Sequence, residues 1–259
     1  MLRPGVLCAD DARLKPSRYV CWNLRATLTE CRALLLDIEG TTTPIAFVYE
    51  VLFPYARAHV REYLLHELDP DVVDLLKQEW RVDASAAPAP PAATATELAA
   101  YVEWLMDRDR KSPGLKRLQG LIWQRGYRAR ELKGEVFADV PPALERWRAD
   151  GIDAAIYSSG SALAQRLLFS TTSFGDLTPL LSGFFDLSFG AKTSADSYGR
   201  IAAALACSTE RMLFVSDSAA ELDAARSAGC RISLCVRPGN PPQPALTDVR
   251  VVHSFDELP

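Results

Sequence analysis

The chain has 259 residues, of which 48% are hydrophobic and 24% charged. This length allows a full hydrophobic core with room for an inserted second module, and the composition excludes wholesale disorder. The formal net charge of −4 gives no global basic field, so we expect no nucleic-acid partner. A small anionic substrate is not excluded, because a bound metal ion can make the field positive inside one cleft.

Residues 1–30 mix proline, arginine and aspartate without periodicity, and we expect them to form a loosely held N-terminal extension. They contain no uninterrupted apolar core of signal-peptide length, and no segment reaches the run of about 18 apolar residues that spans a membrane. The six cysteines are scattered and form no C-x-x-C pair, which is typical of reduced thiols. The sequence therefore predicts a cytoplasmic protein that does not bind membranes.

Four short apolar runs predict buried strands of a parallel sheet, because each is bounded by turn residues. Helical patterns lie between the later runs at Ser161–Phe169, Ser194–Leu205 and Ala219–Ala228, and Gly229 follows where a helix-ending glycine is expected. Strands that alternate with helices indicate a Rossmann-like, doubly wound α/β fold. The four runs are Ala33–Leu36, Ala154–Tyr157, Met212–Ser216 and Arg231–Val236.

The stretch from residue 47 to residue 135 breaks this rhythm and is mostly helical in pattern. We therefore expect a helical cap (47–135) inserted after the first strand, with an α/β core made of residues 31–46 and 136–259. Within the cap, residues 84–93 are rich in alanine and proline. The prolines forbid a continuous helix there and predict a semi-extended surface loop.

Polar side chains lie at or just after the ends of the predicted strands, and one lysine precedes a crossover helix. Ligands of an open α/β sheet bind beyond the carboxyl ends of its strands, so we expect these residues to converge at one edge. Glu221 and Asp223, in contrast, are expected only to favour the dipole of their helix. The converging residues are Asp37, Glu39, Ser158, Ser159, Lys192 and Asp217.

These residue types suit phosphoryl transfer. The carboxylate of Asp37 can attack phosphorus and leave an acyl phosphate, while Glu39 can protonate the leaving oxygen and later deprotonate water. Asp37 and Asp217 are hard oxygen ligands for Mg²⁺. Taken singly, each of these acids has an ordinary explanation as a turn or capping residue, so the prediction depends on the set.

Three further residues of the set can hold the phosphate oxygens. Ser158 and Ser159 offer hydroxyl and backbone N–H groups, and Lys192 offers a positive charge. A Ser-Ser-Gly sequence can also simply cap the helix that follows it, and a lone lysine is usually solvated. We therefore expect a small anionic substrate only because these residues accompany the acids.

The same residues occur in the order of the four motifs of the haloacid-dehalogenase superfamily, which the sequence resembles. The Asp-x-Glu form of the first motif is similar to the enolase-phosphatase branch of methionine salvage, as are DIEGTTTPIAFVYEVLFPYAR (37–57) and IYSSGSALAQRLLF (156–169). The resemblance covers about residues 32–258. The alanine–proline tract and Ser218-Ala219 depart from the pattern of the family.

The resemblance implies an acireductone synthase with one Mg²⁺ per subunit. Such an enzyme enolises 2,3-diketo-5-methylthiopentyl-1-phosphate and then dephosphorylates the enol to 1,2-dihydroxy-3-keto-5-methylthiopentene. It implies that Asp37 is the nucleophile and a metal ligand, that Glu39 gives the metal its backbone carbonyl and keeps its side chain for acid–base work, and that Asp217 completes the metal site. Ser158, Ser159 and Lys192 would bind the substrate. We expect the enzyme to be a monomer.

Two alternatives stay open. The core motifs alone permit a phosphatase for another small phosphate ester, and the second alternative is an inactive binding protein on the same fold, against which the intact Asp37, Glu39, Lys192 and Asp217 argue. Assaying the diketone phosphate beside an aryl phosphate distinguishes the first alternative, and Mg²⁺-dependent phosphate release distinguishes the second. A dehalogenase is disfavoured because it has no use for a metal-binding acid at Asp217.

Overall fold

The computed structural model describes residues 31–67, 69–83, 86–87, 94–110, 112–244 and 246–258. The predicted N-terminal extension lies outside these residues, as does most of the alanine–proline tract at 84–93. Within the described ranges, every helix is too short or too polar to cross a membrane.

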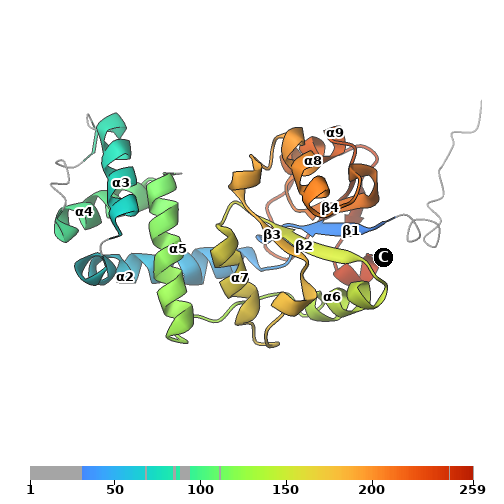
Figure 1. Cartoon of the computed structure of the whole chain (residues 1–259), viewed down its shortest axis with the longest axis horizontal. Coiled ribbons are helices and arrows are strands. Elements are labelled where there is room, and N and C mark those ends of the chain that lie inside the picture. The colour runs from blue at the N-terminus through green and yellow to red at the C-terminus, as the bar shows by residue number, and fades with distance from the viewer. Residues whose placement is uncertain are drawn as a thin grey trace, which may run out of the picture.

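Six strands in the described part of the chain form one parallel sheet in the order β3-β2-β1-β4-β5-β6 (Figure 1). This order, with helices on both faces, confirms the predicted doubly wound α/β fold. The four predicted strands are present, and the sequence analysis missed β3 and β6, which have only three residues each. The strands are β1 (Ala33–Leu36), β2 (Asp153–Tyr157), β3 (Gly183–Phe185), β4 (Met212–Ser216), β5 (Arg231–Cys235) and β6 (Arg250–Val252).

The central strand β1 has apolar side chains on both faces of the sheet. Leu34 and Leu36 belong to the hydrophobic cluster on the side of α6 and α7, whereas Ala33 and Leu35 belong to the cluster under α8 and α9. Successive residues of a strand point to opposite faces, so a continuous apolar run fits a sheet that is covered on both sides. These helices are α6 (Val140–Ala149), α7 (Ala162–Ser170), α8 (Ala195–Ala204) and α9 (Ala219–Ser227).

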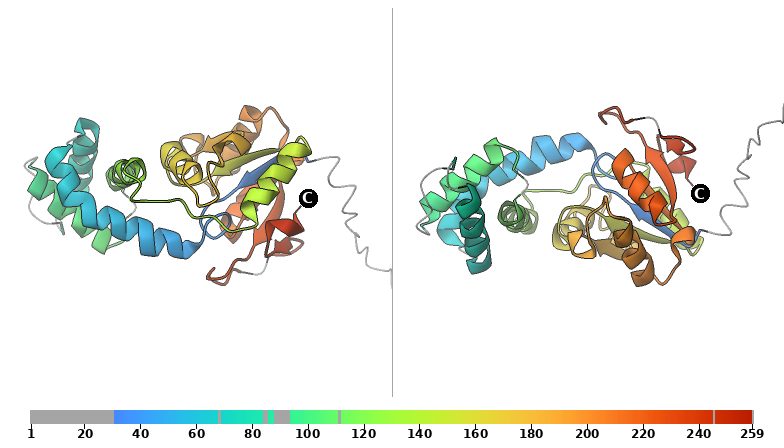
Figure 2. Two further views of the ribbon diagram at one scale, coloured as in Figure 1. Left: turned by 90° about the horizontal axis from the view of Figure 1, so that it is seen from below. Right: turned by 90° about the horizontal axis from the view of Figure 1, so that it is seen from above.

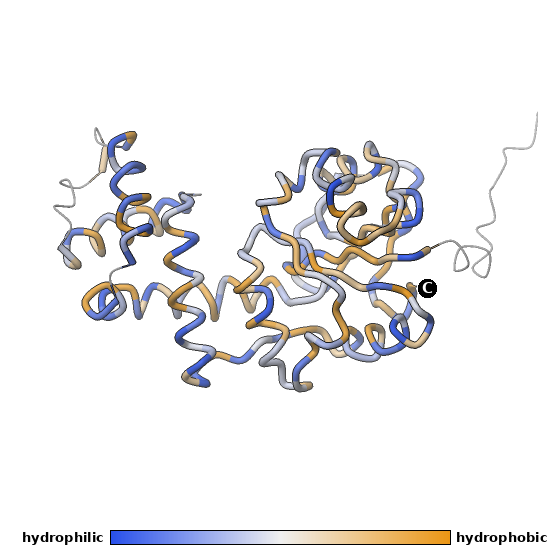
Figure 3. The backbone as a smooth tube through the Cα atoms, viewed as in Figure 1, coloured by the Kyte–Doolittle hydropathy of each residue, from blue (hydrophilic) through white to orange (hydrophobic). Residues whose placement is uncertain are grey.

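The helices found between residues 47 and 128 lie to one side of the sheet (Figure 1, Figure 2). They bury a hydrophobic cluster of their own, and hydrophobic and hydrophilic positions alternate along them (Figure 3). The helical patterns predicted for this stretch are therefore confirmed. Helix α5 packs against α7 of the sheet region. The helices are η1 (Phe47–Leu52, π-helical), α2 (Phe53–His66), α3 (Pro70–Asp83), α4 (Ala95–Asp107) and α5 (Pro113–Arg128).

Short 3₁₀ turns complete the connections around the sheet. Gly229 follows α9 with φ of +89°, as expected for a glycine that ends a helix. The turns are η2 (Thr178–Leu180), η3 (Leu187–Phe189), η4 (Thr209–Arg211) and η5 (Phe255–Glu257).

Candidate active site

The carboxyl ends of β1, β2 and β4 meet at one edge of the sheet. Leu36, the last residue of β1, pairs with Ile156 of β2 and with Val215 of β4, so the residues that follow these strands lie side by side. A cavity of about 620 Å³ opens there, and all six predicted residues line it. The lining comprises Asp37, Glu39, Ser158, Ser159, Lys192 and Asp217, together with Ile45, Tyr49, Ser218, Glu221 and Pro241.

Asp37 is buried, and its carboxylate is held in one orientation. Oδ1 accepts hydrogen bonds from Lys192 Nζ at 2.5 Å and from the Ile38 amide at 2.8 Å, and Oδ2 accepts one from Ser216 Oγ at 3.2 Å. A carboxylate has room for about four such bonds. Oδ2 therefore keeps capacity for a metal ligand bond and for attack on an electrophile.

Lys192 reaches this carboxylate from the loop between η3 and α8. Tyr198 Oη donates to the backbone carbonyl of Lys192 at 2.6 Å, and Lys192 Nζ lies 2.7 Å from Glu221 Oε2 as well as 2.5 Å from Asp37. Burial alone would lower the pKa of Lys192, but the two carboxylates outweigh it and raise the pKa. The lysine is therefore a buried, protonated cation rather than a solvated side chain.

Asp217 lies against the turn that follows β1. A β-carbon at Gly40 would lie 2.4 Å from Asp217 Oδ2 and 2.9 Å from Asn240 Oδ1, and Gly40 has φ of +69°. Only glycine fits such a close approach. Burial, and then the charges of the nearby carboxylates, raise the pKa of Asp217 to about 7. The cavity thus holds more negative charge than Lys192 neutralises.

The donor set at this edge fits Mg²⁺. No three Asp, Glu, His or Cys side chains of the described residues are placed to hold a metal ion by themselves. Mg²⁺ does not need three, because it commonly takes one or two carboxylates and completes its shell with water and phosphate oxygens. Asp37 and Asp217 supply two carboxylates. Near Asp217, Asn240 Oδ1 is a buried acceptor without a partner among the described residues, which fits a hydrated cation.

The serines after β2 face the cavity instead of capping α7. Ser161 is the capping residue, since its Oγ accepts the Ala164 amide at 3.2 Å. Ser158 Oγ accepts the Gly160 amide at 3.2 Å, which tightens the loop in which Ser158 and Ser159 line the cavity. Ser161, and not Ser158 or Ser159, is therefore the residue that caps α7.

Comparison with known proteins agrees with this geometry. The model of the haloacid dehalogenase-like hydrolase family matches residues 31–229. The enolase-phosphatase E1 of Synechococcus elongatus is 53% identical over 231 residues, which cover 87% of this chain and 96% of that protein. This chain belongs to the enolase-phosphatase E1 family. The resemblance inferred from the motifs is thereby confirmed, and phosphatases of the wider haloacid dehalogenase-like family generally use Mg²⁺.

A further relative and a solved structure extend the comparison. A probable bifunctional methylthioribulose-1-phosphate dehydratase/enolase-phosphatase E1 of Zea mays is 43% identical, over 88% of this chain and 47% of that protein. The crystal structure of the UTR4 protein of Saccharomyces cerevisiae is 34% identical, with a TM-score of 0.70, over 88% of this chain and all of that chain. The similarity thus extends well beyond the short motifs.

Glu221 is a cavity residue that the sequence analysis of this enolase-phosphatase family member missed. It was expected only to favour the helix dipole, but its Oε2 pairs with Lys192 and lies 3.0 Å from Ser216 Oγ, whose single proton it shares with Asp37. Burial, and then the charge of Asp37, raise its pKa. No local pattern signals these contacts, because Lys192 belongs to a segment far from Glu221 in the sequence.

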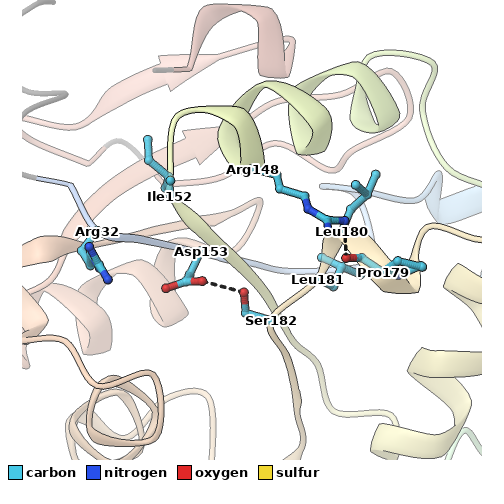
Figure 4. A pocket seen from close by; sticks show the side chains of 9 residues that line it. Arg32, Arg148, Ile152, Asp153, Pro179, Leu180, Leu181 and Ser182 are labelled. Carbon is cyan, nitrogen blue, oxygen red and sulfur yellow. Dashed lines mark hydrogen bonds between the residues drawn. The ribbon is translucent and has the colours of Figure 1, made fainter.

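A second cavity, of about 270 Å³, lies at the opposite edge of the sheet (Figure 4). Ser182 Oγ donates to Asp153 Oδ1 at 2.8 Å, and Arg148 Nη1 donates to the Pro179 carbonyl at 2.8 Å. Its lining includes none of the predicted site residues. The cavity at the carboxyl ends of the strands is therefore the candidate active site.

Proposed function

We propose that this chain converts 2,3-diketo-5-methylthiopentyl-1-phosphate to 1,2-dihydroxy-3-keto-5-methylthiopentene and phosphate, in methionine salvage. The observation that carries the proposal is the single cavity in which Asp37, Lys192 and Asp217 meet at the carboxyl ends of the strands. The printed name of the maize relative joins an enolase-phosphatase to a methylthioribulose-1-phosphate dehydratase. Dehydration of such a sugar phosphate yields a diketone phosphate, which supports this choice of substrate.

Asp37 is proposed to attack phosphorus. The bond from phosphorus to the enol oxygen breaks, and Glu39 donates a proton to that oxygen while the phosphoryl group passes to the carboxylate. Glu39 then takes a proton from the water that attacks the phospho-aspartate, which releases phosphate and restores Asp37. Lys192 holds the negative charge of the transferred group, because its ammonium already lies 2.5 Å from Asp37 Oδ1.

Substrate binding and metal binding are assigned to the other residues of the cavity. Ser158 and Ser159 are proposed to hold phosphate oxygens through hydroxyl and backbone N–H groups. One Mg²⁺ per subunit would be held by Asp37, Asp217 and the Glu39 backbone carbonyl, and when bound it supplies positive charge for the phosphoryl oxygens and for the enolate.

We also propose a domain organisation, a compartment and a set of partners for this chain. Residues 47–135 are proposed to act as a cap over a core made of 31–46 and 136–259, because helices α2–α5 bury their own hydrophobic cluster. We propose that the enzyme works in the cytoplasm, as a monomer, on a small molecule, without nucleic-acid or membrane partners. The free thiols of Cys31, Cys207, Cys230 and Cys235 are consistent with a reducing compartment.

The deciding experiment offers the diketone phosphate and 4-nitrophenyl phosphate to the purified chain, with and without Mg²⁺. We expect Mg²⁺-dependent phosphate release from both esters, with a much higher kcat/KM for the diketone phosphate. Ultraviolet absorbance should report the conjugated enol product at the same time. Preference for the aryl ester would identify a phosphatase with another substrate, and no release from either ester would indicate a binding protein.

A further inference from the structure

Two segments connect helices η1–α5 with the sheet (Figure 2). Residues 37–46 lead from β1 to η1, and residues 129–139 lead from α5 to α6. They contact each other where the Phe137 amide donates to the Thr42 carbonyl at 3.0 Å. Any shift of these helices relative to the sheet must pass through both segments. The first segment also contains Glu39, the proposed acid–base group.

Arg237, which follows β5, bonds to both segments. Its Nε donates to the Thr41 carbonyl at 3.2 Å, and its Nη2 donates to Asp139 Oδ2 at 2.8 Å. A third bond runs from Nη1 to the His253 carbonyl at 2.9 Å. The side chain is buried, with 6% of the residue surface exposed. A planar guanidinium with three directed bonds has essentially one position, which an ammonium group cannot reproduce.

Two aromatic rings and the Asp139 carboxylate compensate the charge of the buried Arg237 guanidinium. Its guanidinium carbon lies 4.5 Å from the centre of the Phe137 ring and 4.9 Å from that of Phe255. Its partner Asp139 also accepts the Phe255 amide at 2.6 Å and Ser254 Oγ at 3.1 Å. The C-terminal turn is thus tied to the same point as the two connecting segments.

The nucleophile is held by different groups. The side chain of Asp37 is held by hydrogen bonds from Lys192 and Ser216. The bonds of Arg237 go instead to the turn at residues 38–43, where three successive amides, from Thr41 to Thr43, donate to the Ile38 carbonyl. Arg237 therefore acts on the position of that turn and not directly on Asp37.

We propose that Arg237 is a positioning residue that sets the turn at 38–43, and with it Glu39, against residues 129–139. The inference rests on the proposed function, because it assumes that Glu39 protonates the leaving oxygen. Loss of Arg237 then impairs protonation of the leaving group more than it impairs attack by Asp37. A merely structural arginine would impair both steps equally.

Two aryl esters of nearly equal size separate these steps. 4-Nitrophenolate leaves almost without protonation, whereas phenolate is a much stronger base and needs a general acid. The value of kcat/KM in the presence of Mg²⁺ reports the steps up to the phospho-enzyme. We expect Arg237→Met to lower kcat/KM for phenyl phosphate about tenfold more than for 4-nitrophenyl phosphate, since a displacement of the acid by even 1 Å costs about this much or more.

Arg146→Met is the matched control. Arg146 Nη2 donates to the Phe255 carbonyl at 2.9 Å. This variant therefore removes an arginine side chain that bonds to the same C-terminal turn, but it removes no bond to residues 37–46. It should change kcat/KM for both esters by the same factor. Arg237→Lys keeps the positive charge and serves if Arg237→Met does not fold; it should show an intermediate difference between the esters.

Equal losses for the two esters in Arg237→Met, or in Arg237→Lys where only that variant folds, would overturn the positioning role while leaving the proposed function intact. A natural chain that releases no phosphate from the aryl esters or from the diketone phosphate with Mg²⁺ would instead refute the proposed function, and the positioning role with it. The two failures are therefore distinguishable within one set of measurements.

Discussion

The β-sheet carries charged residues both at the carboxyl ends of its strands (the carboxyl edge) and at their amino ends (the amino edge), but only the carboxyl edge buries them. At the carboxyl edge, Asp37 and Lys192 are buried against each other, and the pKa of Asp217 is raised to about 7. At the amino edge, Arg32 is exposed and Asp153 shares a hydrogen bond with the exposed Ser182. Burying charge without full compensation is costly, so such groups are retained mainly where a reaction uses them. The contrast assigns chemistry to one edge only.

The sharpest test of this contrast replaces one aspartate at each edge. Asp37→Asn should reduce phosphate release on the order of a thousandfold or more, because the amide is a poor nucleophile. Asp153→Asn at the amino edge should leave the rate nearly unchanged. Steady-state assays with the diketone phosphate measure both. Near-normal phosphate release from Asp37→Asn would refute the covalent mechanism.

The same Asp37→Asn variant separates enolisation from dephosphorylation. Enolisation needs no attack on phosphorus, so part of it should survive if Mg²⁺ stays bound through Asp217 and the Glu39 carbonyl. The enol phosphate should then accumulate and be visible by ultraviolet absorbance and phosphorus NMR. Absence of both reactions with Mg²⁺ shown to be bound would mean that Asp37 also takes part in proton transfer.

Asp217→Asn should have the next largest effect. It removes a charge without changing volume, so the fold should persist while Mg²⁺ affinity falls and turnover drops about a hundredfold at low Mg²⁺. Isothermal titration with Mg²⁺ gives a readout that does not depend on activity. Unchanged Mg²⁺ affinity would remove Asp217 from the metal site.

Much of this carboxyl edge was predictable because local patterns determine it. Apolar runs bounded by turn residues located β1 and β4 to the residue, and strand ends in a parallel sheet necessarily share an edge. The six predicted residues therefore line one cavity, while their individual roles stay predictions. Strand β6 has only three residues, two of them exposed, which is too short for an alternating or continuous apolar pattern to be read.

The missed site features depend on contacts that no local pattern reports. Glu221 was assigned to the helix dipole because its sequence neighbourhood does not show that it faces Lys192 across the sheet edge. Arg237 and Asp139 are separated by 98 positions, and their ion pair forms only once the residue before α6 and the segment after β5 have come together. The helical pattern of residues 47–135 did not show which helix contacts the sheet region, a contact that α5 makes with α7.

Glu221→Gln tests whether this missed acid serves the reaction. The substitution keeps the shape but removes the charge that holds Lys192, so kcat/KM should fall about tenfold. Asp223→Asn is the matched control, since Asp223 lies on the same helix and is exposed. Equal activity of the two variants would return Glu221 to a purely structural role.

Asp139 tests whether a buried ion pair at the carboxyl edge can serve stability instead of chemistry. Burial alone would raise the pKa of Asp139, but the bonds from Arg237 and the Phe255 amide outweigh it and lower the pKa. The ion pair therefore stabilises the fold above the unfolded-state pKa, near 4, and this contribution is lost as pH falls through the lower folded-state pKa. Asp139→Asn should reduce the free energy of unfolding by about 2 kcal/mol at pH 7.

Urea denaturation of both proteins at pH 7 and at pH 3.5 checks this assignment. The difference in unfolding free energy between the natural chain and Asp139→Asn should shrink at the lower pH, because Asp139 of the unfolded chain binds a proton below about pH 4, which stabilises the unfolded state. A difference that stays constant with pH would show that the amide disturbs packing rather than the ion pair.

The smallest effect is expected at the amino edge. Ser182→Ala removes the hydroxyl that donates to Asp153 Oδ1, but both groups are open to water, which can replace the bond. The free energy of unfolding should therefore change by less than about 0.5 kcal/mol, and kcat/KM for the diketone phosphate should not change. Thermal denaturation and the steady-state assay measure the two quantities on one preparation. A clear loss of kcat/KM with unchanged stability would mean that the amino edge communicates with the cavity at the opposite end of the strands, and the contrast between the two edges would then no longer hold.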